Sequence, residues 1–230
     1  IAMAQGYYRI SGKPAGVMVH VTVGTANTIC GLMNSSRDNI PVLLMAGRTP
    51  VTEYGNIGSR NIGIHWGQEN FDQGGMVREY VKWDYELRSN QPVDTLVGRA
   101  LDIAISEPRG PVYLTLPREV LGEPGKVATN RVRSRPLGNA ISVPDLATLE
   151  QAADMVLAAE TPLIVAGKIG SRPDAFDVLG DLARDYGLPV TQVGEPALLS
   201  SHPMNLGFAT GQHLPHADLI LILESAVPWI

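Results

Sequence analysis

Short apolar stretches alternate with stretches of helical periodicity along most of this chain, and this alternation constrains the fold more than any other feature. Apolar runs of strand length occupy residues 17–21, 41–46, 111–117, 162–166 and 218–223. Between them, apolar residues recur every three or four positions, as on one face of a helix. Strands that alternate with helices indicate parallel sheets with right-handed crossover connections. The sequence therefore predicts an α/β fold with parallel sheets flanked by helices.

A change in composition near the middle of the chain predicts two domains. Residues 122–144 are rich in glycine, proline and arginine and have no periodic pattern, which is typical of an interdomain linker. We expect a first domain over residues 1–120, a linker over 121–144 and a second α/β domain over 145–230. The first residue is not methionine and the last strand lacks neighbours, so we expect a piece of a longer polypeptide.

Composition argues against several classes of function. The formal net charge is −5 and no run of lysine or arginine occurs, so we expect neither a nucleic-acid partner nor a membrane-surface helix. No apolar run approaches the ~20 residues that span a bilayer. Cys30 is the only cysteine, which rules out a disulfide framework or a cysteine metal cage within this sequence. These features fit a cytoplasmic protein.

Residues 17–27 form the most informative candidate site. We interpret residues 17–21 as a strand, Gly24 as a close turn and residues 27–37 as a helix, with His20 at the rim. This corner would lie at the carboxyl edge of a parallel sheet, where α/β proteins bind ligands. An ordinary turn with a hydrogen-bonded core histidine is the alternative.

Three further patterns are weaker. Residues 48–75 form a long glycine-rich segment with little periodicity, and loops of that length are usually functional. His202, His213 and His216 invite a metal interpretation, but Pro215 breaks the helix that would align them and no cysteine or carboxylate cluster completes the site, so we expect no metal ligands. The segment from Gly167 to Gly170 is an incomplete dinucleotide-binding pattern.

Five blocks of sequence, at residues 4–14, 24–32, 38–47, 110–120 and 162–167, occur in a characteristic order and spacing. They include Gly-Thr-Ala-Asn at 24–27 and Gly-Pro-Val-Tyr-Leu-Thr-Leu-Pro at 110–117. Together they resemble the thiamine diphosphate-dependent 2-keto acid enzymes, which include acetolactate synthase and benzoylformate decarboxylase.

The resemblance implies an architecture and a set of partners. Residues 1–120 would be the thiamine diphosphate pyrimidine-binding domain without its N-terminus, and residues 145–230 part of a Rossmann-like middle domain. The glutamate that activates the cofactor, and the C-terminal domain that binds the diphosphate and Mg²⁺, would lie outside this sequence, so we expect the chain alone to be inactive. It also implies a homodimer or homotetramer. We do not expect FAD, because residues 206–217 look shorter than in flavin-containing relatives.

The resemblance also implies roles for residues at the corner. Gly24, Thr25 and Asn27 would bind the aminopyrimidine of the cofactor held by the partner subunit, although capping of the helix by Thr25 or Asn27 is compatible with the pattern. Many acetolactate synthases have proline where this chain has Val23. His20 matches a histidine that transfers protons in benzoylformate decarboxylase, and we predict that it is catalytic, with a structural histidine as the alternative.

A second segment resembles acetolactate synthase instead. Trp66, Gln68 and Glu69 match an aromatic-x-Gln-Glu pattern whose glutamine faces the cofactor and substrate. Gln68 would hydrogen-bond a carboxylate or hydroxyl group, and Trp66 would line the pocket or else fill the core. His65 is a further polar candidate, whereas Lys82 is expected to be solvated or salt-bridged.

The expected function is a thiamine diphosphate-dependent lyase or transferase. It would decarboxylate a 2-keto acid, ligate the resulting carbanion to a second carbonyl as acetolactate synthase does, or both. A benzoylformate decarboxylase-like lyase is the alternative. A non-catalytic α/β nucleotide-binding module and a relative that acts on a cyclic diketone or an acyl-CoA are further alternatives.

Overall fold

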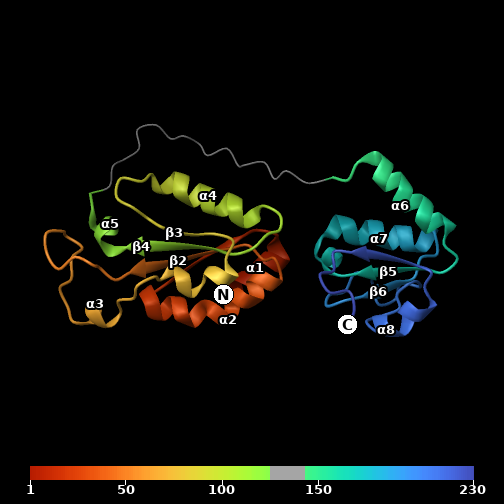
Figure 1. The fold of residues 1–230 in the computed structure, drawn as a ribbon, viewed down its shortest axis with the longest axis horizontal. Helices are drawn as coiled ribbons and strands as arrows, with labels where there is room; N and C mark the ends of the chain where they lie inside the picture. Colours follow the sequence, from red (N-terminus) through yellow and green to blue (C-terminus); the bar gives the residue numbers. More distant parts are fainter. Residues whose placement is uncertain (125–142) are drawn as a thin grey trace. The chain divides into compact units, whose positions relative to one another are not determined.

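The computed structural model describes residues 1–124 and 143–230, which belong to two compact units, Ile1–Ile141 and Ser142–Ile230 (Figure 1). Most of the predicted linker, residues 125–142, lies outside the described residues. Both units contain a parallel sheet flanked by helices, which confirms the predicted α/β class. None of the helices in the described ranges combines the length and apolar character needed to cross a membrane.

The first unit is built on a four-stranded parallel sheet in the order β1-β2-β4-β3. Its strands are β1 Ala15–Val19, β2 Val42–Arg48, β3 Asp84–Glu86 and β4 Val112–Pro117. Val19 of β1 lies opposite Ala46 of β2, and Arg48 of β2 lies opposite Pro117 of β4. Because all four strands run in one direction, their carboxyl ends meet at one edge of the sheet.

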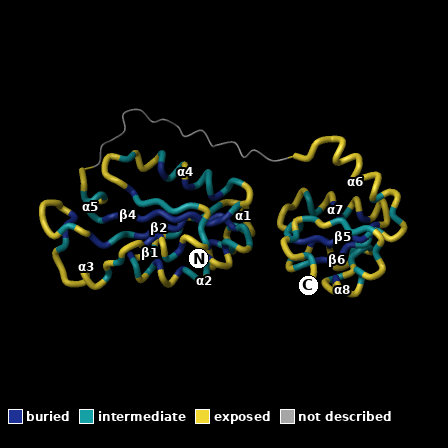
Figure 2. The backbone as a smooth tube through the Cα atoms, in the orientation of Figure 1, coloured by how far each residue is buried: buried dark blue, intermediate teal, exposed yellow. Residues whose placement is uncertain are grey.

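Helices cover both faces of this sheet. The burial of β2 on both faces explains why its sequence is an unbroken apolar run. Leu44 packs with Leu32 of α2 on one face, whereas Leu43 packs with Leu96 of α4 on the other. Successive residues of a strand point to opposite faces, so a strand buried on both sides has no polar alternation. The central strands β2 and β4 are accordingly dark blue over much of their length in Figure 2. The helical elements of this unit are α1 Ala2–Ser11, α2 Val21–Arg37, α3 Ile64–Gly67, η1 Gly74–Met76, η2 Arg78–Tyr80, α4 Val93–Ile105 and α5 Arg118–Gly122.

The boundary between β1 and α2 differs from the prediction. The strand ends at Val19 and the helix begins at Val21, so Gly24 lies inside the helix and not in a turn. The prediction of a strand over residues 17–21 was wrong at this end because Val21 and Val23 are β-branched residues that favour strands. Gly24 allows the helix instead, since a Cβ on Gly24 would lie only 2.9 Å from Cβ of Val19.

A buried hydrogen-bond network joins the first turns of α2 to the rest of the unit. The Tyr113 hydroxyl lies 2.9 Å from Thr25 Oγ1 and accepts a hydrogen bond from Gln73 Nε2 at 2.8 Å. Gln73 Nε2 also donates to the carbonyl of Gly47, and Thr25 Oγ1 donates to the carbonyl of Val21. Gln73 comes from the long segment after β2, so the network fixes that segment against α2 and the central strands.

The second unit is a three-stranded parallel sheet in the order β6-β5-β7. Its helix α6 has no buried residue and is exposed along its length in Figure 2, whereas α7 contributes Leu179 and Ala183 to the core. The elements of this unit are α6 Leu146–Ala158, β5 Pro162–Ala166, η3 Lys168–Ser171, α7 Pro173–Asp185, β6 Val190–Gln192, α8 Thr210–His213, η4 Leu214–His216 and β7 Leu219–Leu223.

The two glycines of the incomplete dinucleotide-binding pattern lie against backbone of this same unit. A Cβ on Gly167 would lie 2.4 Å from the Glu224 carbonyl oxygen, and a Cβ on Gly170 would lie 1.8 Å from the Pro196 carbonyl oxygen. Neither distance leaves room for a side chain. Packing of the loops that follow β6 and β7 therefore accounts for both glycines without a nucleotide.

We predict that Tyr113→Phe lowers the free energy of unfolding by about 1–3 kcal/mol, because it leaves a buried amide proton of Gln73 without an acceptor. Urea unfolding followed by circular dichroism measures the change. Tyr54→Phe is the matched control, since Tyr54 is 86% exposed. An unfolding midpoint that Tyr113→Phe leaves equal to that of the control would contradict the role given to the network.

We predict that Gly170→Ala destabilises the second unit by about 1–3 kcal/mol, because the new methyl group forces the backbone at Pro196 to move. Gly211→Ala is the control, since a Cβ added at Gly211 would meet no atom within 4 Å outside the local helix backbone. Thermal unfolding of both variants provides the comparison. Equal melting temperatures would show that the close approach at Gly170 has no energetic consequence.

Candidate functional site

The carboxyl edge of the first unit's sheet brings together residues that are far apart in the sequence. His20 follows β1, Thr49 follows β2 and Arg118 follows β4. The segment after β2 contains α3, which lies with α5 at the same end of this unit in Figure 1. Ligands of open parallel sheets bind at this edge.

His20 is exposed at the junction between β1 and α2. It is the N-cap residue of α2, and its ring makes no capping hydrogen bond. Across the described ranges, no hydrogen bond involves the His20 side chain, so the alternative of a hydrogen-bonded core histidine does not describe this structure. The next residue, Val21, has a φ of 34°, a strained value for a β-branched side chain. This tight corner leaves an imidazole at the surface, where it can exchange protons with a ligand.

The predicted cofactor-binding residues separate into buried and exposed positions. Gly24 is accounted for by its contact with Val19, and Thr25 is fully buried in the hydrogen-bond network. Asn27 is exposed, and its Nδ2 donates to the carbonyl of Val23 one turn earlier. Of these three predicted residues, Asn27 presents a side chain that a ligand can reach, whereas Thr25 can act only by positioning its neighbours.

Gln68 lies beside the first turn of α2. Its backbone carbonyl accepts hydrogen bonds from Thr22 Oγ1 at 2.7 Å and from Thr49 Oγ1 at 3.2 Å. The Gln68 side chain is half-buried. The segment after β2 therefore docks its predicted catalytic glutamine next to the junction that carries His20.

Trp66 is half-exposed and does not fill the core. Its side chain is 48% exposed, and the Arg60 guanidinium carbon lies 5.0 Å from the ring centre. Arg60 Nη2 also forms an ion pair with Glu69 Oε2 at 2.5 Å. A cation stacked on an aromatic face stabilises both groups and fixes the ring, so Trp66 can act as a wall of a binding site.

Arg118 and His65 form a contact that the sequence analysis missed. Nη1 of Arg118 lies 3.2 Å from Nδ1 and 3.0 Å from Nε2 of His65, and it donates to Asn61 Oδ1. Desolvation, together with the charges of Arg118 and Arg60, lowers the pKa of His65. A charged residue directly after a strand that ends at this edge was the available signal for Arg118.

Lys82 lies at the other edge of the sheet. Its Nζ donates to the carbonyls of Ile103 and Ser106 at 2.5 and 2.6 Å, and its backbone amide donates to Pro111, directly before β4. Burial lowers the pKa of its ammonium group despite the opposing charge of Glu107. The hydrogen bonds of Lys82 therefore link the end of α4 to the amino edge of the sheet.

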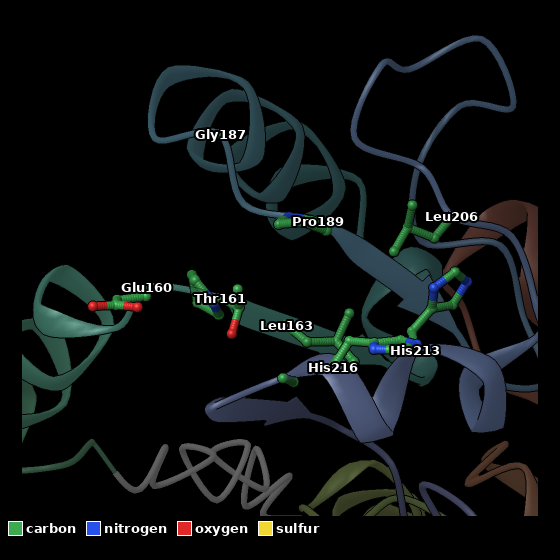
Figure 3. A pocket seen from close by; sticks show the side chains of 10 residues that line it. Glu160, Thr161, Leu163, Gly187, Pro189, Leu206, His213 and His216 are labelled. Carbon is green, nitrogen blue, oxygen red and sulfur yellow. The ribbon is translucent and has the colours of Figure 1, made fainter.

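Two of the three histidines of the second unit, His213 and His216, line a shallow hollow of about 300 Å³ (Figure 3). His213 and His216 lie on one side of it, and Glu160 is well separated from both rings. Across residues 1–124 and 143–230, no group of three or more potential metal ligands is close enough to hold an ion.

A family model described as the thiamine pyrophosphate enzyme N-terminal TPP binding domain matches residues 1–76, which include His20, Gly24, Asn27 and Gln68. The chain is 27% identical to benzoylformate decarboxylase from Pseudomonas aeruginosa over 82% of its length, and 26% identical to acetolactate synthase from Arthrospira platensis over 89% of its length. It covers 34% of each of these relatives, so it spans about a third of their length.

A solved structure supports the same fold. The thiamine diphosphate-dependent 4-hydroxybenzoylformate decarboxylase of Rhodococcus jostii superimposes with a TM-score of 0.81 over 96% of this chain and 42% of its own, at 23% identity. The family match covers the part of the first unit that carries His20 and Gln68, and the names of both relatives are those of enzymes of the expected class. Residues 1–76 therefore match the N-terminal TPP binding domain of thiamine pyrophosphate enzymes, and most of the chain is similar in sequence to benzoylformate decarboxylase and acetolactate synthase.

Proposed function

We propose that this chain is part of an enzyme that decarboxylates a 2-keto acid, ligates the resulting carbanion to a second carbonyl as acetolactate synthase does, or does both. The observation that carries the proposal is the exposed His20 ring at the carboxyl edge, which has no hydrogen-bond partner in the described residues. A group that transfers protons must be free to approach a ligand. His20 meets this requirement within the family-matched segment.

The exposed face of α2 fits the aminopyrimidine ring of thiamine diphosphate. Val23 is 53% exposed and Asn27 lies one turn further along the same face. An apolar surface next to an amide suits a flat ring with polar edges. When bound, the cofactor supplies the carbon nucleophile and the electron sink of the reaction.

The residues of this chain then have separate tasks. His20 would donate or accept a proton at the carbon or oxygen that was the keto group, because an imidazole can act as a general acid or a general base. Gln68 would hydrogen-bond a substrate oxygen, and Trp66 would exclude water from one side of the substrate. Mg²⁺ bound by a further domain, a homodimer or homotetramer and a cytoplasmic location belong to the same proposal.

A benzoylformate decarboxylase-like lyase is the second candidate, and His20 favours it. The resemblance implies a histidine at this position in benzoylformate decarboxylase but not in most acetolactate synthases. The two candidates differ in product, since a lyase releases an aldehyde and a carboligase forms a new carbon–carbon bond.

The reaction can be tested on the complete gene product with thiamine diphosphate, Mg²⁺ and either pyruvate or benzoylformate. We expect cofactor-dependent release of CO₂, and the organic product identifies the lyase or the carboligase. Calorimetry measures cofactor binding independently. If the protein binds the cofactor but releases no CO₂ from either acid, it is a cofactor-binding protein and not the proposed enzyme. If it neither binds the cofactor nor releases CO₂, the proposal is wrong.

We predict that His20→Ala lowers turnover by about 10²- to 10⁴-fold, because it removes the proton-transferring group. The free energy of unfolding should change by less than about 0.5 kcal/mol, since an exposed side chain without partners contributes little. Steady-state kinetics and urea unfolding measure the two quantities. His216→Ala, at another exposed histidine, should change neither, and undiminished turnover of His20→Ala would return His20 to a structural role.

A further inference from the structure

Arg118 shares the carboxyl edge with His20. β4 ends at Pro117, which pairs with Arg48 of β2, and β2 pairs with β1 through Ala46 and Val19. The ends of β1 and β4 are therefore two strand spacings apart across the sheet and two residues apart along it, which together is roughly 12 Å. A small ligand at this edge can contact side chains from both strand ends.

Arg118 differs from the other two arginines at this edge in the charge of its partners. Arg48 pairs with Glu86 at 2.5 Å, and Arg60 pairs with Glu69. In the described part of the chain, the side-chain partners of Arg118 are Asn61 and His65. Its positive charge is therefore not compensated by a carboxylate of these residues.

The hydrogen bonds of His65 indicate that its ring is neutral. The Asn61 backbone amide donates to His65 Nδ1 at 3.3 Å, which leaves the ring proton on Nε2. Arg118 and Arg60 also disfavour a second proton, and together with desolvation they lower the pKa of His65. Nη1 of Arg118 donates to Asn61 Oδ1 and faces the acceptor Nδ1 of His65 at 3.2 Å, because a protonated Nε2 cannot accept a hydrogen bond. No hydrogen bond within residues 1–124 and 143–230 uses its Nε or Nη2.

The backbone around Arg118 is firmly placed. A Cβ on Gly58 would lie 2.6 Å from the Arg118 carbonyl oxygen, so the segment after β2 packs closely on this residue. Glu119 Oε1 accepts hydrogen bonds from the amides of Val51 and Thr52 at 2.7 and 3.0 Å. The guanidinium is therefore attached to a support with little freedom to move.

We propose that Arg118 binds the carboxylate of the 2-keto acid through the two N–H groups at Nε and Nη2. This inference rests on the proposed function and specifies which residue selects an acid over a neutral carbonyl compound. Two parallel hydrogen bonds from one guanidinium match the geometry of a carboxylate. Trp66, adjacent to His65 in the sequence, would face the remainder of the substrate.

The binding step can be tested on the 230-residue chain by nuclear magnetic resonance, without cofactor. Its five histidines give separable ring signals, and His65→Gln identifies the signal of His65. We expect pyruvate to shift the His65 ring signal saturably and to raise the pKa of His65, because the carboxylate offsets the charge of Arg118. Pyruvamide, which keeps the keto group but lacks the charge, should do neither.

Variants at two arginines distinguish specific binding of the carboxylate by Arg118 from a nonspecific effect of the protein's net charge. Arg118→Gln should weaken the pyruvate response by about 10- to 100-fold, the range expected for a lost charge-assisted hydrogen bond. Arg118→Lys should give an intermediate loss, since it keeps the charge but not the paired geometry. Arg99→Gln on the exposed side of α4 is the matched control and should bind as the wild type does. Equal affinity of wild type and both Arg118 variants, a response to pyruvamide as strong as to pyruvate, or no saturable response would overturn the proposal.

A kinetic measurement on the complete gene product distinguishes this inference from the proposed function. Arg118→Gln should raise KM for the 2-keto acid by about 10- to 100-fold and leave cofactor affinity unchanged. An unchanged KM in an active enzyme would remove the role of Arg118 alone. Loss of all cofactor-dependent chemistry in the wild type would remove the proposed function, while the resonance experiment would still report on carboxylate binding.

Discussion

The hydrogen bonds between Thr25, Tyr113 and Gln73 are the constraint on which the candidate site depends. The three residues are 0%, 0% and 2% exposed, respectively. An unpaired polar group is costly at such depth, so the hydrogen bonds of all three side chains must form together. Thr25 orients the first turns of α2, Tyr113 belongs to the central strand β4, and Gln73 brings in the segment after β2. The positions of His20 and Gln68 follow from this interior arrangement.

This arrangement also explains why a short motif combines residues with different tasks. Gly24 and Thr25 face the interior, one for close packing on Val19 and the other for the network. Asn27 and His20 are exposed and can meet a ligand. The motif thus specifies the shape of the junction as much as its chemistry, and substituting its buried members would disturb the exposed ones.

Much of the first unit could be predicted because its determinants are local. Apolar runs located β2 and β4 to within a residue or two, and alternation with helices indicated parallel sheets. The start of α2 was misplaced because β-branched Val21 and Val23 favour a strand, while the contact that permits a helix, Gly24 on Val19, is tertiary. The pairing of Arg118 with His65 joins residues 53 positions apart, and no local pattern reports such a contact.

The positive φ of Val21 has a consequence for anyone who engineers this protein. Glycine would relieve the backbone strain, which costs roughly 1–2 kcal/mol for an ordinary residue, but it would also remove a side chain that is 8% exposed and sits over Gly47. A more relaxed corner would let the neighbouring imidazole sample more orientations. Backbone stability and a fixed orientation of the His20 ring therefore oppose each other at a single position of this fold.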